Sequence, residues 1–134
     1  MKAGKVTLVG IGPGRAGGMT ADALQAMEEA DVLCGYTVYI DLVREMFPEK
    51  AFYVTSMTKE RERCRWALET AYSGQSVALV CSGDAGVYGM AGLLLSMASE
   101  EENRPDIRIE TVPGVTAATA GAAILGAPLM NDFC

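Results

Sequence analysis

The residues whose types could do chemistry lie in the middle of the chain, directly after a short apolar run. Val77–Cys81 is mostly β-branched and small, and it breaks abruptly into Ser82–Gly86. A helix-like apolar pattern resumes afterwards, so the stretch predicts a strand, a loop and a helix. Gly83 and Gly86 would let the backbone approach a ligand closely, and Asp84 would supply a fixed hydrogen-bond acceptor.

Asp84 also has a second interpretation, which the sequence leaves open. Aspartate is a favoured N-cap residue, and a helix is expected to begin near Gly86. Asp84 would then accept from backbone N–H groups of that helix rather than bind a ligand.

Two further expected loops carry glycine in the same way. One, Ile11–Gly18, follows a strand at 5–10, and the other, Pro113–Thr116, follows a strand at 107–112. In a doubly wound parallel sheet the loops after the strands lie at one edge, where ligands bind. The convergence of three such loops therefore predicts a ligand site.

The first of these loops, Gly12–Gly17, fits the letters of the dinucleotide pattern G-x-G-x-x-G. Its register differs, because Gly17 precedes the expected helix, whereas the pattern places its third glycine inside the helix. The acidic residue that should close the second strand is missing, since Asp31 opens that strand instead. A nicotinamide-dependent oxidoreductase is therefore the weaker alternative, and a P-loop is excluded because no Gly-Lys-Ser/Thr occurs.

The elements that must position these loops alternate along the chain. Strands are expected at 31–35, 51–54 and 77–81 besides the two named above, and helices at 21–30, 40–46, 59–72, 86–97 and 117–125. Thr20 and Thr116 are the expected N-caps of the first and last helices. The alternation predicts the α/β class, with a parallel five-stranded sheet and helices on both faces.

Charge and composition restrict the function classes. The 134 residues are 50% hydrophobic and carry a net charge of −6, which indicates one globular domain and disfavours a nucleic-acid partner. No apolar run is long enough for a membrane span, so we expect a soluble, cytoplasmic protein with no membrane partner. On the third expected helix, Arg61, Arg63 and Arg65 alternate with glutamates, which predicts an exposed face rather than a substrate patch.

Cysteine and histidine usage excludes several chemistries. The four cysteines show no C-x-x-C spacing and the chain has no histidine, so we expect no metal site and free, buried thiols at Cys34, Cys64, Cys81 and Cys134. The usual general base and every Ser/His or Cys/His pair are also missing.

Three segments resemble, in order and spacing, the tetrapyrrole methylase family. They are Gly10–Gly14, Ser82–Gly89 and Val112–Ala118. Two others, Gly35–Tyr39 and Gly126–Cys134, resemble in particular those members that methylate C17 of precorrin-3B or cobalt-precorrin-3.

The resemblance implies S-adenosyl-L-methionine-dependent methylation at C17, with ring contraction, of a corrinoid tetrapyrrole in cobalamin biosynthesis. It also implies a homodimer of two-domain subunits that bind the cofactor between their domains. Residues 1–134 would be the N-terminal domain, and the C-terminal domain would lie outside this chain, because Ala127–Cys134 stops where another element should begin. The alternatives are another methylase of the same pathway or an inactive cofactor-binding fragment.

The resemblance also assigns site residues. By position, the family's cofactor contacts fall on Pro13, Ser82, Gly83, Asp84, Val87, Thr116 and Ala117. Substrate contacts are expected at Gly12, Gly14, Arg15 and Tyr88, and Arg15 could pair with a carboxylate of the macrocycle. Methyl transfer requires alignment rather than a base, so no catalytic residue is assigned. Ring contraction could use proton transfer, for which the candidates by residue type are Tyr36, Tyr39 and Tyr88.

Overall fold

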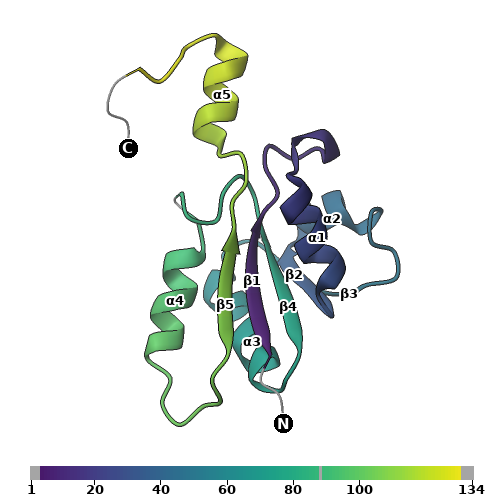
Figure 1. Cartoon of the computed structure of the whole chain (residues 1–134), viewed down its shortest axis with the longest axis vertical. Helices are drawn as coiled ribbons and strands as arrows, with labels where there is room; N and C mark the ends of the chain where they lie inside the picture. Colours follow the sequence, from purple (N-terminus) through teal and green to yellow (C-terminus); the bar gives the residue numbers. More distant parts are fainter. Residues whose placement is uncertain (1–3, 88, 131–134) are drawn as a thin grey trace.

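A parallel five-stranded sheet forms the centre of the computed structural model, which describes residues 4–87 and 89–130 (Figure 1). The strand order is β3-β2-β4-β1-β5. Their bounds are β1 Lys5–Gly10, β2 Val32–Tyr36, β3 Ala51–Thr55, β4 Ser76–Cys81 and β5 Arg108–Val112. The predicted fold class is confirmed, and each predicted strand end lies within one residue of the observed one.

The helices cover both faces of the sheet. Their bounds are α1 Ala21–Glu29, α2 Thr37–Arg44, α3 Glu60–Tyr72, α4 Ala91–Ser99 and α5 Ala117–Leu125. The chain moves toward one edge from β1 to β3 and toward the other from β3 to β5. Because such crossovers are right-handed, α1 and α2 lie on one face and α3 and α4 on the other.

Alternate residues of the strands fill two apolar layers. The layer under α3 and α4 includes Leu8, Leu79, Leu68 and Leu94, and the opposite layer includes Val9, Val80, Met27 and Ile40. The predicted buried free thiols are confirmed at three positions, Cys34, Cys64 and Cys81, while Cys134 lies outside the described residues.

Both predicted N-caps are confirmed. The Thr20 hydroxyl accepts from the Ala23 N–H at 3.0 Å, and the Thr116 hydroxyl accepts from the Ala118 N–H at 3.4 Å. Their helices differ in packing, because α1 buries two residues whereas α5 has none buried and projects beyond the sheet (Figure 1). Within residues 4–87 and 89–130 no helix is long and apolar enough to cross a membrane.

Helix α2 begins earlier than predicted. The sequence predicted a helix from residue 40, because the aromatic and β-branched residues before it favour a strand. In the structure β2 ends at Tyr36 and α2 starts at Thr37, whose hydroxyl donates to the Thr55 carbonyl at 3.1 Å. The early start brings Val38 and Tyr39 to the carboxyl edge of the sheet.

The prediction that the charged residues of α3 form an exposed face is wrong for Arg63. Arg63 is buried, because it lies on the same stripe of the helix as Cys64, Ala67 and Leu68, which faces the sheet. The alternation of charges along the sequence could not predict this burial. The stripe of α3 that packs on the sheet begins in the first turn of the helix, at Arg63 itself. Arg61 and Arg65 are exposed, as expected.

Candidate functional site

The site lies where the direction of the chain reverses. Strands β1 and β4 are neighbours, but the chain leaves β1 for α1 on one face and leaves β4 for α4 on the other. The chain segments after these two strands therefore lead to opposite faces of the sheet from its carboxyl edge. In open α/β sheets this point is the usual ligand crevice.

Two glycines join the first and second loops across this point. The Gly12 N–H donates to the Gly83 carbonyl at 3.1 Å, and the Gly83 N–H donates to the Gly12 carbonyl at 2.9 Å. Both have positive φ, 74° for Gly12 and 59° for Gly83, a conformation that other residues adopt only with strain. The bridge therefore depends on glycine at both positions.

A third glycine brings in the loop after β5. A Cβ added at Gly114 would lie 2.3 Å from the Gly83 carbonyl oxygen and 2.6 Å from that of Gly10. A Cβ at Gly10 would lie 2.9 Å from the Gly114 nitrogen. At these glycines the three loops thus pack backbone against backbone, because no side chain keeps them apart.

Asp84 holds this arrangement together. One carboxylate oxygen accepts from the Gly114 N–H at 2.9 Å, and the other accepts from the Gly86 N–H at 2.9 Å. The N-cap interpretation is wrong, because α4 begins only at Ala91 and its N-cap position is Met90. The expected helix start near Gly86 is wrong for the same reason: residues 82–87, 89 and 90 precede the helix, and Asp84 shapes this loop through its hydrogen bond to Gly86.

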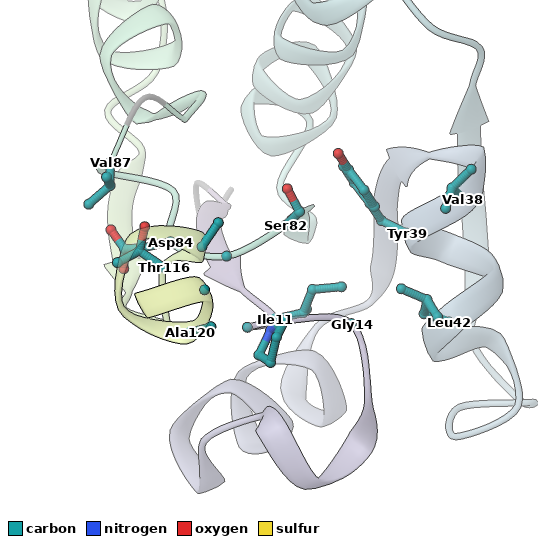
Figure 2. Close-up of a pocket in the computed structure, with 15 residues that line it drawn as sticks. Ile11, Gly14, Val38, Tyr39, Leu42, Ser82, Asp84, Val87, Thr116 and Ala120 are labelled. Atoms are coloured by element: carbon teal, nitrogen blue, oxygen red, sulfur yellow. The ribbon is translucent and has the colours of Figure 1, made fainter. Parts of the chain in front are cut away.

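A cavity of about 430 Å³ opens beside the three loops (Figure 2). Asp84 and Thr116 lie on one side of it, and Val38 and Leu42 of α2 lie on the other. All seven residues predicted to contact the cofactor line this cavity: Pro13, Ser82, Gly83, Asp84, Val87, Thr116 and Ala117.

The residues predicted to contact the substrate divide into two groups. Gly12 and Gly14 line the cavity. Arg15 is exposed on the first loop and is not among the lining residues, and Tyr88 lies outside the described residues. A substrate contact at any of these positions stays a prediction.

Helix α2 supplies lining residues that the sequence analysis did not assign. Val38 and Leu42 are 50% and 40% exposed, and Tyr39, proposed only for proton transfer, lies beside them. The sequence analysis could not find them, because its predicted helix began at residue 40 and left Val38 outside. In α2 as observed, Val38 and Leu42 are four residues apart and share a face that Ile40 and Val43 do not. The other unassigned lining residues are Ile11, Ala120 and Gly121.

A second cavity, of about 340 Å³, adjoins the first. The two share Tyr39, Ser82 and Val87 as lining residues, and the second is also lined by Arg63 and Cys81. Burial raises the pKa of the Cys81 thiol to about 12, so this thiol stays protonated at neutral pH and is no nucleophile. In the described part of the chain, no group of His, Cys, Asp and Glu is arranged to hold a metal ion.

Comparison with known proteins identifies the family of the chain. A family model for tetrapyrrole (corrin/porphyrin) methylases matches residues 5–134. The chain is 45% identical over 129 residues to a probable cobalt-factor III C(17)-methyltransferase of Salmonella typhimurium, covering 96% of this chain and 53% of that protein. It is 38% identical over 133 residues to a cobalt-factor III methyltransferase of Priestia megaterium, covering 98% of this chain and 25% of that protein.

A solved structure matches as well. The crystal structure of the methyltransferase CobJ aligns with a TM-score of 0.85 and 37% identity, covering 98% of this chain and 55% of that one. The chain thus spans about half the length of the Salmonella relative and of the CobJ structure. The fold, the three loops and these matches agree, and the chain belongs to the tetrapyrrole methylase family.

Proposed function

We propose that the chain supplies the S-adenosyl-L-methionine site of a methyltransferase that methylates C17 of a corrin precursor, precorrin-3B or its cobalt-bearing counterpart, in cobalamin biosynthesis. The names and identities of the Salmonella and Priestia relatives support this reaction. The whole enzyme would include a second domain that this chain does not contain. The observation that carries the proposal is the gathering of three loops around one cavity at the reversal point of the sheet.

The cavity's chemistry fits this cofactor. Its walls are largely apolar, with Val38, Leu42 and Val87 available to an adenosyl group. A Cβ at Gly12 would lie 2.4 Å from the Gly18 carbonyl oxygen, and one at Gly83 would lie 3.5 Å from the Thr116 Cα, so glycine at both positions lets the loops that line the cavity pack closely. S-adenosylmethionine supplies a methyl group on a sulfonium, and the chain's part is to align the two reactants and exclude water. This needs no histidine, and the chain has none.

Tyr39 is the residue we propose for proton transfer in the accompanying ring contraction. It lines both cavities, and its ring packs edge-to-face on Tyr36 at a centroid distance of 5.2 Å, which fixes its orientation. The assignment rests on position and residue type.

We further propose a cytoplasmic homodimer. Three buried free thiols suit a reducing compartment. Helix α5 exposes Ile124 and Leu125, at 84% and 79%, which a second subunit would cover. Sedimentation velocity of the whole protein tests the dimer, and a monomer at every concentration contradicts it.

The test of the cofactor assignment is calorimetric titration of the chain with S-adenosylhomocysteine and, separately, with NADH. The whole Salmonella relative serves as the positive control. We expect S-adenosylhomocysteine to bind and NADH not to bind. Binding of NADH alone would favour the oxidoreductase alternative, and no binding of S-adenosylhomocysteine would contradict the proposal that these three loops supply most of the site.

A further inference from the structure

Arg63 is a buried cation, and the described part of the chain gives it no anionic partner. The residue is 5% exposed, and none of the ion pairs in residues 4–87 and 89–130 includes it. A guanidinium stays protonated at any physiological pH. Burial of an unpaired charge is costly, so a protein keeps one where a ligand supplies the missing charge or where the fold requires it.

The contacts of Arg63 are all with neutral groups. Its Nη1 donates to the Thr55 hydroxyl at 2.5 Å and to the Ser56 carbonyl at 3.5 Å. Its Nη2 faces the Met90 sulfur at 3.8 Å, and a thioether is a weak acceptor. Its Nε is buried with no hydrogen-bond partner among the residues that the structure describes. Donor capacity is therefore left over at a buried, positively charged group.

This group lines the second cavity, which adjoins the cofactor cavity at Tyr39, Ser82 and Val87. Glu60, one turn earlier on α3, also lines the cavity and is exposed. An anion would be repelled on the Glu60 side, so it would approach from the wall formed by Tyr39 and Ser82. A ligand in the first cavity could extend a group along that path.

We propose that Arg63 binds a carboxylate of the ligand that occupies these two cavities. The planar guanidinium suits a carboxylate because two parallel N–H···O bonds can form. The inference rests on the proposed function, under which two ligands carry carboxylates. They are the acidic side chains of the corrin macrocycle and the amino-acid end of S-adenosylmethionine.

The test uses three variants of the 134-residue chain. Arg63→Met removes the charge and keeps most of the side-chain length. Arg63→Lys keeps the charge but removes the planar guanidinium that can form two parallel hydrogen bonds. Arg61→Met is the matched control, because Arg61 lies on the same helix and is exposed. Thermal melting is measured first. A binding role predicts that Arg63→Met melts no lower than the Arg61→Met control, since it removes an unpaired buried charge.

Calorimetry then uses two matched pairs of probes. One pair is S-adenosylhomocysteine and its decarboxylated analogue, and the other is a corrinoid polycarboxylic acid and its methyl ester. We expect Arg63→Met to weaken one acid probe at least tenfold while leaving unchanged the partner probe that lacks the free carboxylate. If Arg63→Met binds the corrinoid acid more weakly, the carboxylate belongs to the macrocycle. If it binds S-adenosylhomocysteine more weakly, the carboxylate belongs to the cofactor.

Equal binding of every probe by the wild-type chain and both Arg63 variants would overturn the inference. If Arg63→Met does not fold, Arg63→Lys decides by the same comparison. Should the wild-type chain bind the corrinoid acid but not S-adenosylhomocysteine, the cofactor proposal fails while the corrinoid pair still tests Arg63. Binding of no probe by the wild-type chain would overturn both.

Discussion

The carboxylate of Asp84 accepts a hydrogen bond from the backbone N–H of Gly114 at 2.9 Å, across 30 positions of the chain. Its second oxygen accepts from Gly86, within its own loop. One side chain therefore folds the loop after β4 and attaches it to the loop after β5. The shape of the cavity of about 430 Å³ beside these loops depends on this link.

Asp84→Ala should destabilise the chain by about 1–2 kcal/mol, because two N–H groups lose a charged acceptor at a partly exposed site. Asp84→Asn should cost less, since its single carbonyl oxygen can keep the bond to Gly114. Urea unfolding measures both. Both variants should bind S-adenosylhomocysteine more weakly, with unchanged helix content, because α4 starts at Ala91. A loss of helix signal with unchanged affinity would restore the N-cap interpretation.

Gly114→Ala should be among the most damaging small substitutions in the chain. Its Cβ would lie 2.3 Å from the Gly83 carbonyl oxygen, and backbone cannot move aside as a flexible side chain can. We expect a loss of about 3 kcal/mol or more in the free energy of unfolding. Gly92→Ala is the control, since nothing lies within 4 Å of its Cβ in α4, and it should stabilise by about 0.5–1 kcal/mol. Equal effects would contradict the packing described for the three loops.

The two threonine caps should differ in their effect on unfolding. Thr20→Ala should lower global stability by about 1 kcal/mol, because α1 is packed on the sheet through Ala23 and Met27. Thr116→Ala should mainly increase local opening of α5, which has no buried residue. Hydrogen exchange separates the cases: faster exchange restricted to residues 117–125 is expected for Thr116→Ala. A global change of the same size as for Thr20→Ala would be inconsistent with α5 being unpacked.

Stability should fall as the pH rises above about 9, because burial raises the pKa of three thiols from an ordinary value of 9.0. The pKa reaches about 12 for Cys34 and Cys81 and about 11 for Cys64, with a smaller opposing effect of the nearby Arg63. In this range the unfolded chain loses protons that the folded chain keeps. Each thiol's contribution is complete below the unfolded pKa and is lost as the pH rises toward the folded one, at up to about 1.4 kcal/mol per pH unit.

Urea unfolding at several pH values between about 8 and about 10 measures this slope. Cys34→Ala is the informative variant, because it removes one thiol and should reduce the slope by up to about one third, whatever its effect on stability at neutral pH. An identical slope for the variant and the wild-type chain would show that Cys34 ionises as readily in the folded protein as in the unfolded one.

Local features of the sequence were enough to predict the succession of strands and helices along the chain, the parallel sheet and the loops of the site. Periodicity of apolar residues decides which segments pack, and glycine at Gly12, Gly83 and Gly114 indicates where backbones meet closely. These are local properties, so they can be read without knowing the neighbours. The threonine caps at Thr20 and Thr116 were predictable for the same reason.

Which groups face each other depends on how the helices and strands pack, and the sequence alone could not predict it. Asp84 is chemically suited both to capping a helix and to binding a ligand, and its bond to Gly114 depends on β5 lying beside β1. Arg63 stands in a run of alternating charges, yet packing of α3 against the sheet buries it beside the second cavity. The lining role of Val38 and Leu42 likewise required the true start of α2. In each case the deciding interaction joins residues far apart in sequence, and local composition carries no information about such pairs.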